Sequence, residues 1–449
     1  GLTPSAEAHL GHARSFLFFD LLRRYLTHRG YVVTYVQNVT DIDDRSINRA
    51  RETGEAWHDI VMGYYERFKT SMRRLRVMDP DIEPYATQFI AEIQGMIRDL
   101  VARGLAYRAQ DGIYYRVSAF PHYGSLSNRN IAELESGARI EIDEHKEDPL
   151  DFALWKFAKP GEPQWPFEDY GDGRPGWHIE CSAMSRHLLD SQGLGFDIHG
   201  GGADLIFPHH ENEIAQSEPL MTTPPMANFW IHGGLLNFDG RKMSKSLGNF
   251  EPLSDLLERH DAQALRIAFL TTGYSKVMNF TDDSLADALK TYERLKKTYR
   301  RFAKYTPVLP PRETQTLLPK IEAALDEDMN TSVALAELLQ WSGPESEGAA
   351  GEFERALWLL GLSPEPSWLL ERAREMPDGV IERLQQTLAA KIDFTDATPE
   401  QAVALVIDAR SRARAAKDFA ASDRLRDALA GCGIAIKDSK EGTTWSIAG

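Results

Sequence analysis

The stretch HLGHARSFLFFDLLRRYLTHRGYVVTYVQNVTDIDD, residues 9–44, already outlines a fold. Apolar side chains at three- and four-residue spacing predict a helix over Ala13–Arg29, which Gly30 ends. The β-branched and aromatic run Tyr31–Val36 then predicts a buried strand, followed by a polar loop. This order is typical of one βαβ-type unit of a nucleotide-binding sheet, in which ligands bind beyond the strand ends.

The segments after residue 44 fit such a sheet with an interruption. Amphipathic patterns predict helices at Glu55–Arg74 and Phe89–Arg103. Short strands, turns and Pro-rich pieces over residues 106–176 predict an insertion. We expect the sheet to resume at Phe196–His199, directly before the glycine-rich run Gly200–Asp204.

The remaining chain is mostly helical. The predicted helical regions are Glu251–Ser275, Asp282–Arg301, Leu317–Ala390 with a break at Gly343–Gly351, and Thr398–Gly431. A linker at Tyr305–Arg312 and a strand pair within Ile434–Ile447 complete the pattern. The predicted fold class is α/β: a Rossmann-type parallel-sheet domain with an inserted connective domain, followed by an α-helical bundle and a small C-terminal α+β domain.

The composition is that of an ordinary globular chain with a basic tail. Its 449 residues are 42% hydrophobic and 26% charged, with a net charge of −16, so we expect roughly two to four domains. No apolar run reaches the ~18 residues of a membrane span, and two cysteines fit a reducing cytoplasm. The acidic charge argues against indiscriminate nucleic-acid binding, but residues 401–449 carry eight Lys and Arg against six Asp and Glu, a net charge of +2.

The sequence GRKMSKSLGN at 240–249 is a candidate phosphate-binding loop. It follows strand and turn pieces between Gly233 and Phe238, and it holds two lysines and two serines. A polar, doubly cationic loop suits a phosphate that is gripped during reaction and then released. Alternatively, it is a solvated surface loop.

The tetrapeptide HLGH at 9–12 is a second candidate phosphate site. Two histidines at a helix start can donate to phosphate oxygens, and Gly11 lets a nucleotide approach the backbone. The alternative is a turn with one buried histidine. The pair of HLGH and GRKMSKSLGN is far more specific than either motif alone.

A third set of residues is suited to a metal. His209 and Glu213 are spaced i, i+4, so both face one way on a helix. Together with Cys181 they offer an imidazole, a carboxylate and a thiolate, which are plausible zinc ligands. The alternatives are a helix start with surface charges for the first two, and a small core residue for Cys181.

Seven stretches then carry a resemblance to a known family. They are HLGHAR at 9–14, YVQNVTDIDDR at 35–45, DPLDFALWK at 148–156, GRPGWHIECSAMS at 173–185, FDIHGGGADLIFPHHENEIAQS at 196–217, KMSKSLGN at 242–249 and GTTW at 442–445. With them the chain resembles the cysteinyl-tRNA synthetases, a family of class I aminoacyl-tRNA synthetases, over nearly its whole length.

The resemblance implies a two-step reaction. L-Cysteine is activated by ATP to cysteinyl-adenylate and then transferred to the 3′-terminal adenosine of tRNA(Cys). His9 and His12 would stabilise the α-phosphoryl charge, and Lys242 and Lys245 would hold the β- and γ-phosphates. Mg²⁺ would accompany ATP. Two alternatives stay open: a cysteine:glucosaminyl-inositol ligase of mycothiol synthesis, a sister family that shares the motifs, and a catalytically inactive tRNA-binding relative.

The resemblance also implies one Zn²⁺ per chain that binds the substrate thiolate. Cys181, His209 and Glu213 match three of the family's four ligands. The fourth is a cysteine immediately before the glycine that aligns with Gly1, and we expect that the sequence given starts one residue after it. Zinc prefers a soft thiolate to the hydroxyl of serine, which would select cysteine without an editing site.

Further roles are implied by the resemblance. The ATP-binding set is His9, Gly11, His12, Asp204, Lys242, Ser244, Lys245 and Ser246. The cysteine-binding set is Thr3, Thr40 and Trp177; Thr40 is alternatively a helix cap, and Trp177 alternatively packs at a domain seam. The tRNA set is Arg410, Arg412, Arg414 and Trp445, although we favour core packing for Trp445.

The resemblance finally divides the chain into domains, and we expect a monomer. The boundaries are 1–105 and 177–235 for the two halves of the catalytic domain, 106–176 for the inserted domain, 236–303 for the domain with KMSKS, 304–395 for a helical bundle that contacts the tRNA stem, and 396–449 for an anticodon-binding domain.

Overall fold

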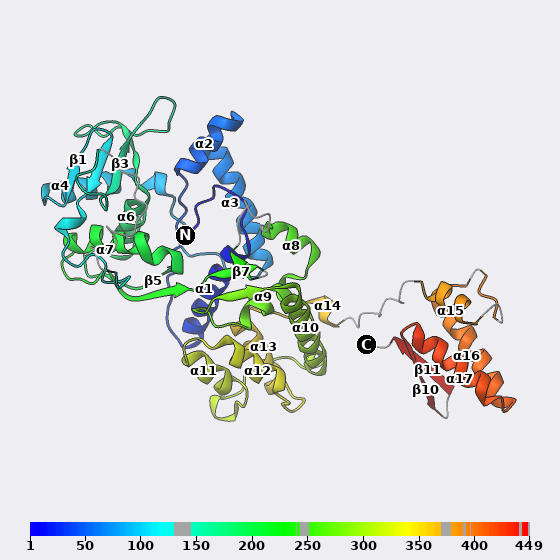
Figure 1. Ribbon diagram of the computed structural model, residues 1–449. Helices are drawn as coiled ribbons and strands as arrows, with labels where there is room; N and C mark the ends of the chain where they lie inside the picture. Colours follow the sequence, from blue (N-terminus) through cyan, green and yellow to red (C-terminus); the bar gives the residue numbers. More distant parts are fainter. Residues whose placement is uncertain are drawn as a thin grey trace. The chain divides into compact units, whose positions relative to one another are not determined.

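The computed structural model describes residues 1–129, 145–238, 240–242, 251–369, 379–388, 392–395, 397–439 and 442–447. The chain forms two compact units, Gly1–Trp368 and Leu369–Gly449, whose elements are labelled in Figure 1.

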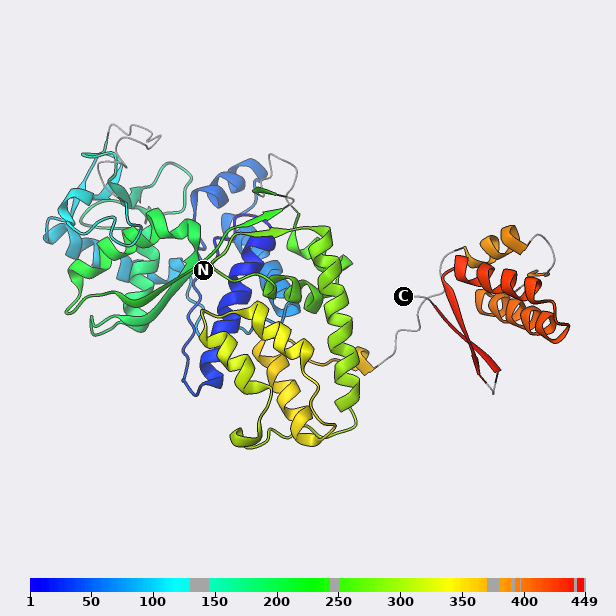
Figure 2. The ribbon, with the colours of Figure 1, turned by 60° about the horizontal axis from the view of Figure 1, so that its bottom comes forward.

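Helix α1 (Leu10–His28) is the central element of the first unit. Its N-cap is His9, and Gly30 follows its last turn with a φ of +92°, where glycine is favoured. The predicted helix is therefore confirmed. Contacts of α1 with β5, β6, β7, α9 and α13 place it between strands and helices, as the blue helix in Figure 2 shows.

The strand predicted at Tyr31–Val36 is wrong except at its last residue, Val36, which forms a bridge. Val32 is 99% exposed and Tyr31 is 65% exposed. Strand pairing instead centres on the fully buried Val39, about five residues later. The parallel bridges are Leu2↔Val39, Val36↔Ile82 and Val39↔Tyr85. The position of the strand is set by partners on both sides, not by the run with the highest β propensity.

Strands β5 (Phe196–Gly202) and β6 (Ala227–Gly233) form a second parallel pair. This confirms the strand predicted at Phe196–His199. Helix α1 lies close against β5, because a Cβ at Gly200 would come within 2.3 Å of the Phe19 ring. The fold is thus mixed α/β, as predicted.

Residues from the predicted insertion form an antiparallel sheet in the order β1-β2-β3-β4. The strands are β1 (Ala106–Arg108), β2 (Gly112–Tyr115), β3 (Phe152–Phe157) and β4 (Gly173–Pro175). Trp155, which is fully buried, packs in a core shared with α4 (Ile90–Ala102) and α6 (Trp177–Leu189).

A smaller sheet, in the order β8-β7-β9, leads toward the lysine-rich motif. Strand β7 (Leu236–Phe238) pairs with β8 (Arg241–Lys242) in antiparallel fashion and with β9 (Met278–Phe280) in parallel fashion. Gly240, with a φ of +73°, makes the turn between β7 and β8.

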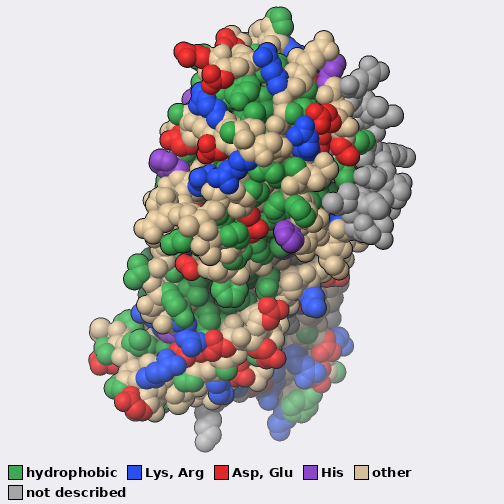
Figure 3. All heavy atoms as spheres, turned by 90° about the vertical axis from the view of Figure 1, so that its left-hand side faces the viewer, with side chains coloured by type: hydrophobic (Ala, Val, Ile, Leu, Met, Phe, Trp, Pro, Cys, Tyr) green, Lys and Arg blue, Asp and Glu red, His purple; other side chains and the backbone are tan. Residues whose placement is uncertain are grey.

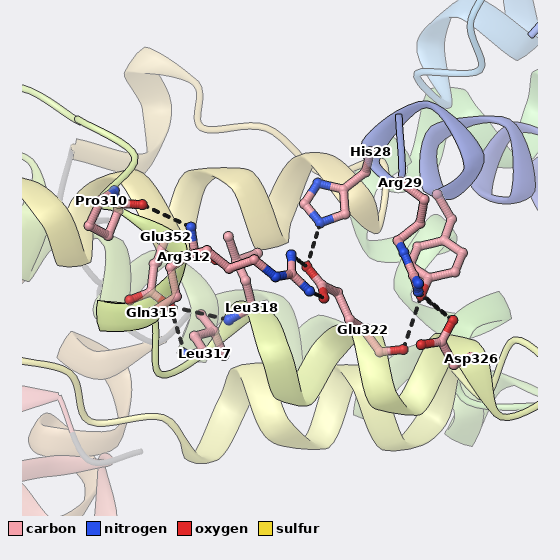
Figure 4. A network of polar contacts seen from close by, with 11 residues as sticks. His28, Arg29, Pro310, Arg312, Gln315, Leu317, Leu318, Glu322, Asp326 and Glu352 are labelled. Atoms are coloured by element: carbon pink, nitrogen blue, oxygen red, sulfur yellow. Dashed lines mark hydrogen bonds and ion pairs between the residues drawn. The ribbon is translucent and has the colours of Figure 1, made fainter. Parts of the chain in front are cut away.

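Helices from the C-terminal part of the first unit's sequence pack against α1. At the end of α1, His28 Nε2 lies 2.8 Å from Glu322 Oε1, and the Tyr25 hydroxyl donates to Asp326 at 2.6 Å. Arg312 pairs with the same Glu322 carboxylate, as Figure 4 shows. These contacts fasten α1 to α11 (Leu318–Asp326). A single core cluster joins α1 to these helices.

The remaining helices of the first unit include both α-helices and short turns. The α-helices are α2 (Asp44–Thr53), α3 (Trp57–Arg74), α7 (Glu211–Ser217), α8 (Leu253–Arg259), α9 (Ala262–Leu270), α10 (Asp282–Phe302), α12 (Thr331–Gln340), α13 (Glu347–Leu359) and α14 (Pro366–Leu369). The short turns are η1 (Ala86–Phe89), η2 (Val117–Ala119), η3 (Ala203–Leu205), η4 (Ile206–His210), η5 (Glu218–Leu220) and η7 (Arg312–Thr314).

The second unit is a small α+β structure with its own core. It contains α15 (Val380–Leu388), α16 (Pro399–Ala415), α17 (Phe419–Gly431) and the antiparallel pair β10 (Ile434–Ser439) and β11 (Gly442–Ile447). The strand pair predicted within residues 434–447 is confirmed. Within the described parts of both units, no helix is long and apolar enough to cross a membrane.

Candidate active site

The HLGH motif caps helix α1 through both of its histidines. The Gly11 amide donates to His9 Nδ1 at 3.1 Å, and the His9 amide donates to His12 Nδ1 at 3.2 Å. An Nδ1 that accepts a hydrogen bond carries no proton, so each neutral ring holds its proton on Nε2. Burial, with a further contribution from His9, lowers the pKa of His12 to about 3. The helix start therefore presents imidazole N–H donors at the positive end of its dipole.

The predicted metal ligands come together. Cys181 Sγ on α6, a ring nitrogen of His209 on η4 and a carboxylate oxygen of Glu213 on α7 all lie within 4.8 Å of one another. His209 Nε2 and Glu213 Oε1 are 3.0 Å apart. Glu213 Oε1 is buried and makes no hydrogen bond of good geometry within the described residues. A cation bound among these atoms would satisfy that oxygen, so the donor set fits a zinc ion.

Each of the three candidate ligands is held by a polar neighbour that the sequence interpretation missed. The Asn38 amide donates to Cys181 Sγ at 3.3 Å. His178 Nδ1 lies 2.9 Å from Nδ1 of His209, and His199 Nε2 lies 3.0 Å from Glu213 Oε2. Such partners orient metal ligands in proteins. The available signals were the i, i+3 spacing of His178 and Cys181 and the position of His199 in the strand FDIH.

The electrostatics of this cluster also favour a cation. Burial, and next the nearby Glu213 carboxylate, raise the pKa of the Cys181 thiol well above its ordinary value. Burial acts to raise the pKa of the Glu213 carboxyl, but the neighbouring His199 and His209 lower it by more, so this pKa lies well below its ordinary value. Burial lowers the pKa of His178 to about 3, so this ring is neutral and can accept from His209. A divalent cation would stabilise the thiolate that burial disfavours.

Glu213 is also shared with a second histidine group. His199, His210 and Glu213 offer ligand atoms within 4.8 Å of one another. His210 Nδ1 lies 2.8 Å from His232 Nε2, and burial lowers the pKa of His210 to about 2. Because both groups use Glu213, we treat them as one site.

Of the predicted cysteine-binding residues, Trp177 lies against this cluster. The Trp177 ring centroid is 4.3 Å from that of His209, and the Trp177 side chain is 43% exposed, which argues against core packing. Thr40 is buried, and its amide donates to the Leu2 carbonyl at 3.0 Å, beside the half-buried Thr3. The cap of α2 is Asp43, so Thr40 is not a helix cap.

The predicted ATP residues are described only in part. Asp204 is exposed in η3, at the end of β5. Lys242 ends β8, where it pairs with Asn237. Ser244, Lys245 and Ser246 lie outside the described residues.

The predicted tRNA residues differ in their surroundings. Arg410 is buried, and its two terminal nitrogens donate to Asp438 at 2.9 Å each. Arg414 donates to the same carboxylate at 2.6 Å and stays half-exposed, and Arg412 is exposed. Trp445 packs against the core of the second unit, which agrees with the packing role that the sequence favoured.

Comparison with known proteins identifies the family. Residues 1–290 match the catalytic domain of class I (C) tRNA synthetases, and residues 395–445 match the anticodon binding domain of cysteinyl-tRNA ligases. The cysteine–tRNA ligases of Stutzerimonas stutzeri and Azotobacter vinelandii are both 43% identical to this chain; they align with 100% of it and with 94% and 93% of their own lengths. The cysteine–tRNA ligase of Pseudomonas aeruginosa is 42% identical over 100% of this chain and 94% of its own length.

Solved structures agree at the level of the fold. Methionyl-tRNA synthetase of Mycobacterium tuberculosis bound by methionyl-adenylate has a TM-score of 0.53 at 15% identity, covering 80% of this chain and 87% of that chain. The LeuRS–tRNA–LeuAMS complex of Agrobacterium radiobacter has a TM-score of 0.56 at 13% identity, covering 80% and 82%. On this evidence the chain belongs to the cysteine–tRNA ligase family of class I tRNA synthetases.

Proposed function

We propose that this enzyme activates L-cysteine with ATP and transfers the cysteinyl group to the 3′-terminal adenosine of tRNA(Cys). The observation that carries the proposal is the Cys181–His209–Glu213 donor set, whose ligand atoms lie within 4.8 Å of one another. Relatives that are 42–43% identical over the whole chain are named cysteine–tRNA ligases, and a thiolate-binding centre fits that substrate.

Activation needs charge stabilisation more than proton transfer. A carboxylate oxygen of cysteine attacks the α-phosphorus of ATP, and pyrophosphate leaves with the electrons of the broken P–O bond. The attacking carboxylate is already ionised, so no general base is required. His9 and His12 place their Nε2–H groups at the start of α1, and Lys242 and Lys245 supply cations from the other motif. Mg²⁺ accompanies ATP in this scheme.

Cysteine selection is assigned to the metal site. Cys181, His209 and Glu213 would hold Zn²⁺, and the bound ion would supply a centre that prefers the thiolate of cysteine to the hydroxyl of serine. His178 fixes the His209 ring so that Nε2 faces Glu213. Trp177 lies against the His209 ring, and we propose that Trp177, Thr40 and Thr3 contact the bound amino acid.

The second step transfers the cysteinyl group to tRNA. The tRNA hydroxyl attacks the adenylate carbonyl, and AMP leaves. We propose that Arg412 and Arg414, and not primarily Arg410, contact the tRNA phosphates, because the Arg410 guanidinium is buried against Asp438. On the face shown in Figure 3, basic and acidic side chains are interspersed, which presents a mixed field to a polyanion. We propose that the enzyme acts as a monomer in the cytoplasm.

The amino-sugar ligase alternative is not favoured. The chain matches the anticodon binding domain over residues 395–445, and such a domain serves a tRNA substrate. A catalytically inactive relative would retain tRNA binding without adenylate formation.

The test is pyrophosphate exchange into ATP with purified protein and zinc. We expect exchange that depends on cysteine and is not supported by an equal concentration of serine. Exchange with serine at a similar rate would contradict the metal-based selection. Absence of exchange with any amino acid would contradict the activation chemistry itself.

A further inference from the structure

Arg14 is a buried cation that neither phosphate motif uses. It lies on α1, two residues after His12, and is 6% exposed. Nη1 donates to the carbonyls of Gly234 and Leu235 at 3.0 and 2.6 Å. Nη2 donates to the carbonyls of Gly273, Tyr274 and Lys276. Within the described residues no carboxylate pairs with it, so its charge is met by carbonyl dipoles.

These carbonyls belong to two loops that begin neighbouring strands. Gly234 and Leu235 join β6 to β7, and residues 273–276 join α9 to β9. The loops also bond to each other, since the Gly234 amide donates to the Tyr274 carbonyl at 2.7 Å. A Cβ at Gly234 would lie 2.3 Å from the Lys276 carbonyl oxygen, so the loops close tightly at this point. Arg14 thus joins α1 to the root of the β8-β7-β9 sheet, and α1 lies beside β7 (Figure 1).

This sheet leads directly to the lysine-bearing motif. Strand β8 ends at Lys242, and it is held to β7 through the pairs Asn237↔Lys242 and Phe238↔Arg241. Helix α1 begins with His9 and His12. The helix that begins with the two histidines and the sheet that carries Lys242 therefore meet at Arg14, about 3 Å along the helix axis from His12.

The chemistry of Arg14 is poorly suited to a purely structural role. Burying a guanidinium without a carboxylate carries a desolvation penalty that an apolar side chain of similar volume would avoid. Its rigid, planar set of donors can span several carbonyls, which a lysine cannot. Arg24 provides the contrast: it lies on the same helix with the same 6% exposure, but it pairs with Asp20 at 2.9 Å and bonds to the Trp358 carbonyl on the bundle side.

We propose that Arg14 is a positioning residue for the adenylation step. It holds the β8-β7-β9 sheet, and with it Lys242, at a fixed place relative to His9 and His12. This inference rests on the proposed function, because it concerns the same ATP reaction. A displacement of about 1 Å between reacting groups can lower a rate by about 100-fold.

The experiment compares Arg14→Met with Arg24→Met in the full-length enzyme. Both changes remove the donors and keep a long side chain. Cysteine-dependent pyrophosphate exchange gives kcat and the KM values for ATP and cysteine, and thermal unfolding gives stability. We expect Arg14→Met to lower kcat by about 100-fold while KM for cysteine stays within about twofold. Arg24→Met should lose thermal stability and keep kcat within about twofold of the wild-type value.

A second readout separates positioning from general disruption. Arg14→Ala leaves a space shaped for a guanidinium, so guanidinium chloride at low millimolar concentration should restore part of its kcat, whereas equal sodium chloride should not. If Arg14→Met does not fold, Arg14→Lys is measured instead, and its kcat should fall while its KM for cysteine is kept.

Three results would overturn the proposal: an unchanged kcat in the folded Arg14 variant, an equal loss in Arg24→Met, or no rescue by guanidinium. Failure of wild-type enzyme to exchange pyrophosphate would instead contradict the proposed function, which keeps the two failures distinct.

Discussion

Replacing His178 with phenylalanine should weaken zinc binding without removing a ligand. His178 lies 2.9 Å from Nδ1 of His209, and its ring meets Phe152 edge to face at 5.6 Å, so a phenyl ring fits the same space. The variant leaves the His209 Nδ1–H without an acceptor, which costs about 1–3 kcal/mol. Loss of such a partner typically lowers metal affinity about 10- to 100-fold, and the two estimates agree.

The assay is competition for zinc between the protein and a chelator of known affinity. His187→Phe is the matched control, because His187 is on the same helix α6 but is 54% exposed at its side chain. We expect a zinc dissociation constant about 10- to 100-fold higher for His178→Phe and an unchanged value for the control. A folded His178→Phe protein that binds zinc as tightly as wild type would refute the argued role of this contact.

Three further outcomes follow from the same structure. Lys245→Ala should slow pyrophosphate exchange because it removes about 3–4 kcal/mol of transition-state stabilisation, and the urea midpoint of unfolding should change little. Unchanged exchange would disprove its phosphate role. Asp20→Asn should lower the free energy of unfolding of the first unit by about 3–5 kcal/mol, because Asp20 is buried between Arg24 and Arg266. Urea titration measures this change, and a value below about 1 kcal/mol would show that the pairing contributes little. Burial lowers the pKa of His12 from 6.5 to about 3, so near pH 6 only the unfolded chain binds this proton, and the free energy of unfolding decreases as the pH falls below about 6.5. Between pH 7 and 5 the free energy of unfolding of His12→Phe should therefore decrease by up to about 2 kcal/mol less than that of the wild type. An identical dependence on pH would contradict the lowered pKa.

Local patterns in the sequence predicted those features that depend on neighbours along the chain. The apolar spacing after HLGH predicted α1, and the i, i+4 spacing predicted that His209 and Glu213 share a face. The strand at residues 196–199 was also predicted correctly. The strand at Tyr31–Val36 failed, because the pairing of Val39 with Leu2 and Tyr85 outweighs the propensity of the preceding run.

The contacts that orient the site could not be read from local spacing. Asn38 reaches Cys181 across 143 residues, and Arg14 reaches Gly234 across 220 residues. Nothing in the composition of either segment points to the other. The predicted roles of Ser244, Lys245 and Ser246, and the division of the chain into domains, stay predictions.

The most direct test of the account is charging of tRNA(Cys) with labelled cysteine by the zinc-loaded enzyme. The account predicts cysteinyl-tRNA that depends on ATP and is lost when Glu213→Gln removes a candidate zinc ligand. Cysteine-dependent pyrophosphate exchange without any charging of tRNA would contradict it and would point to a different acceptor for the activated cysteine.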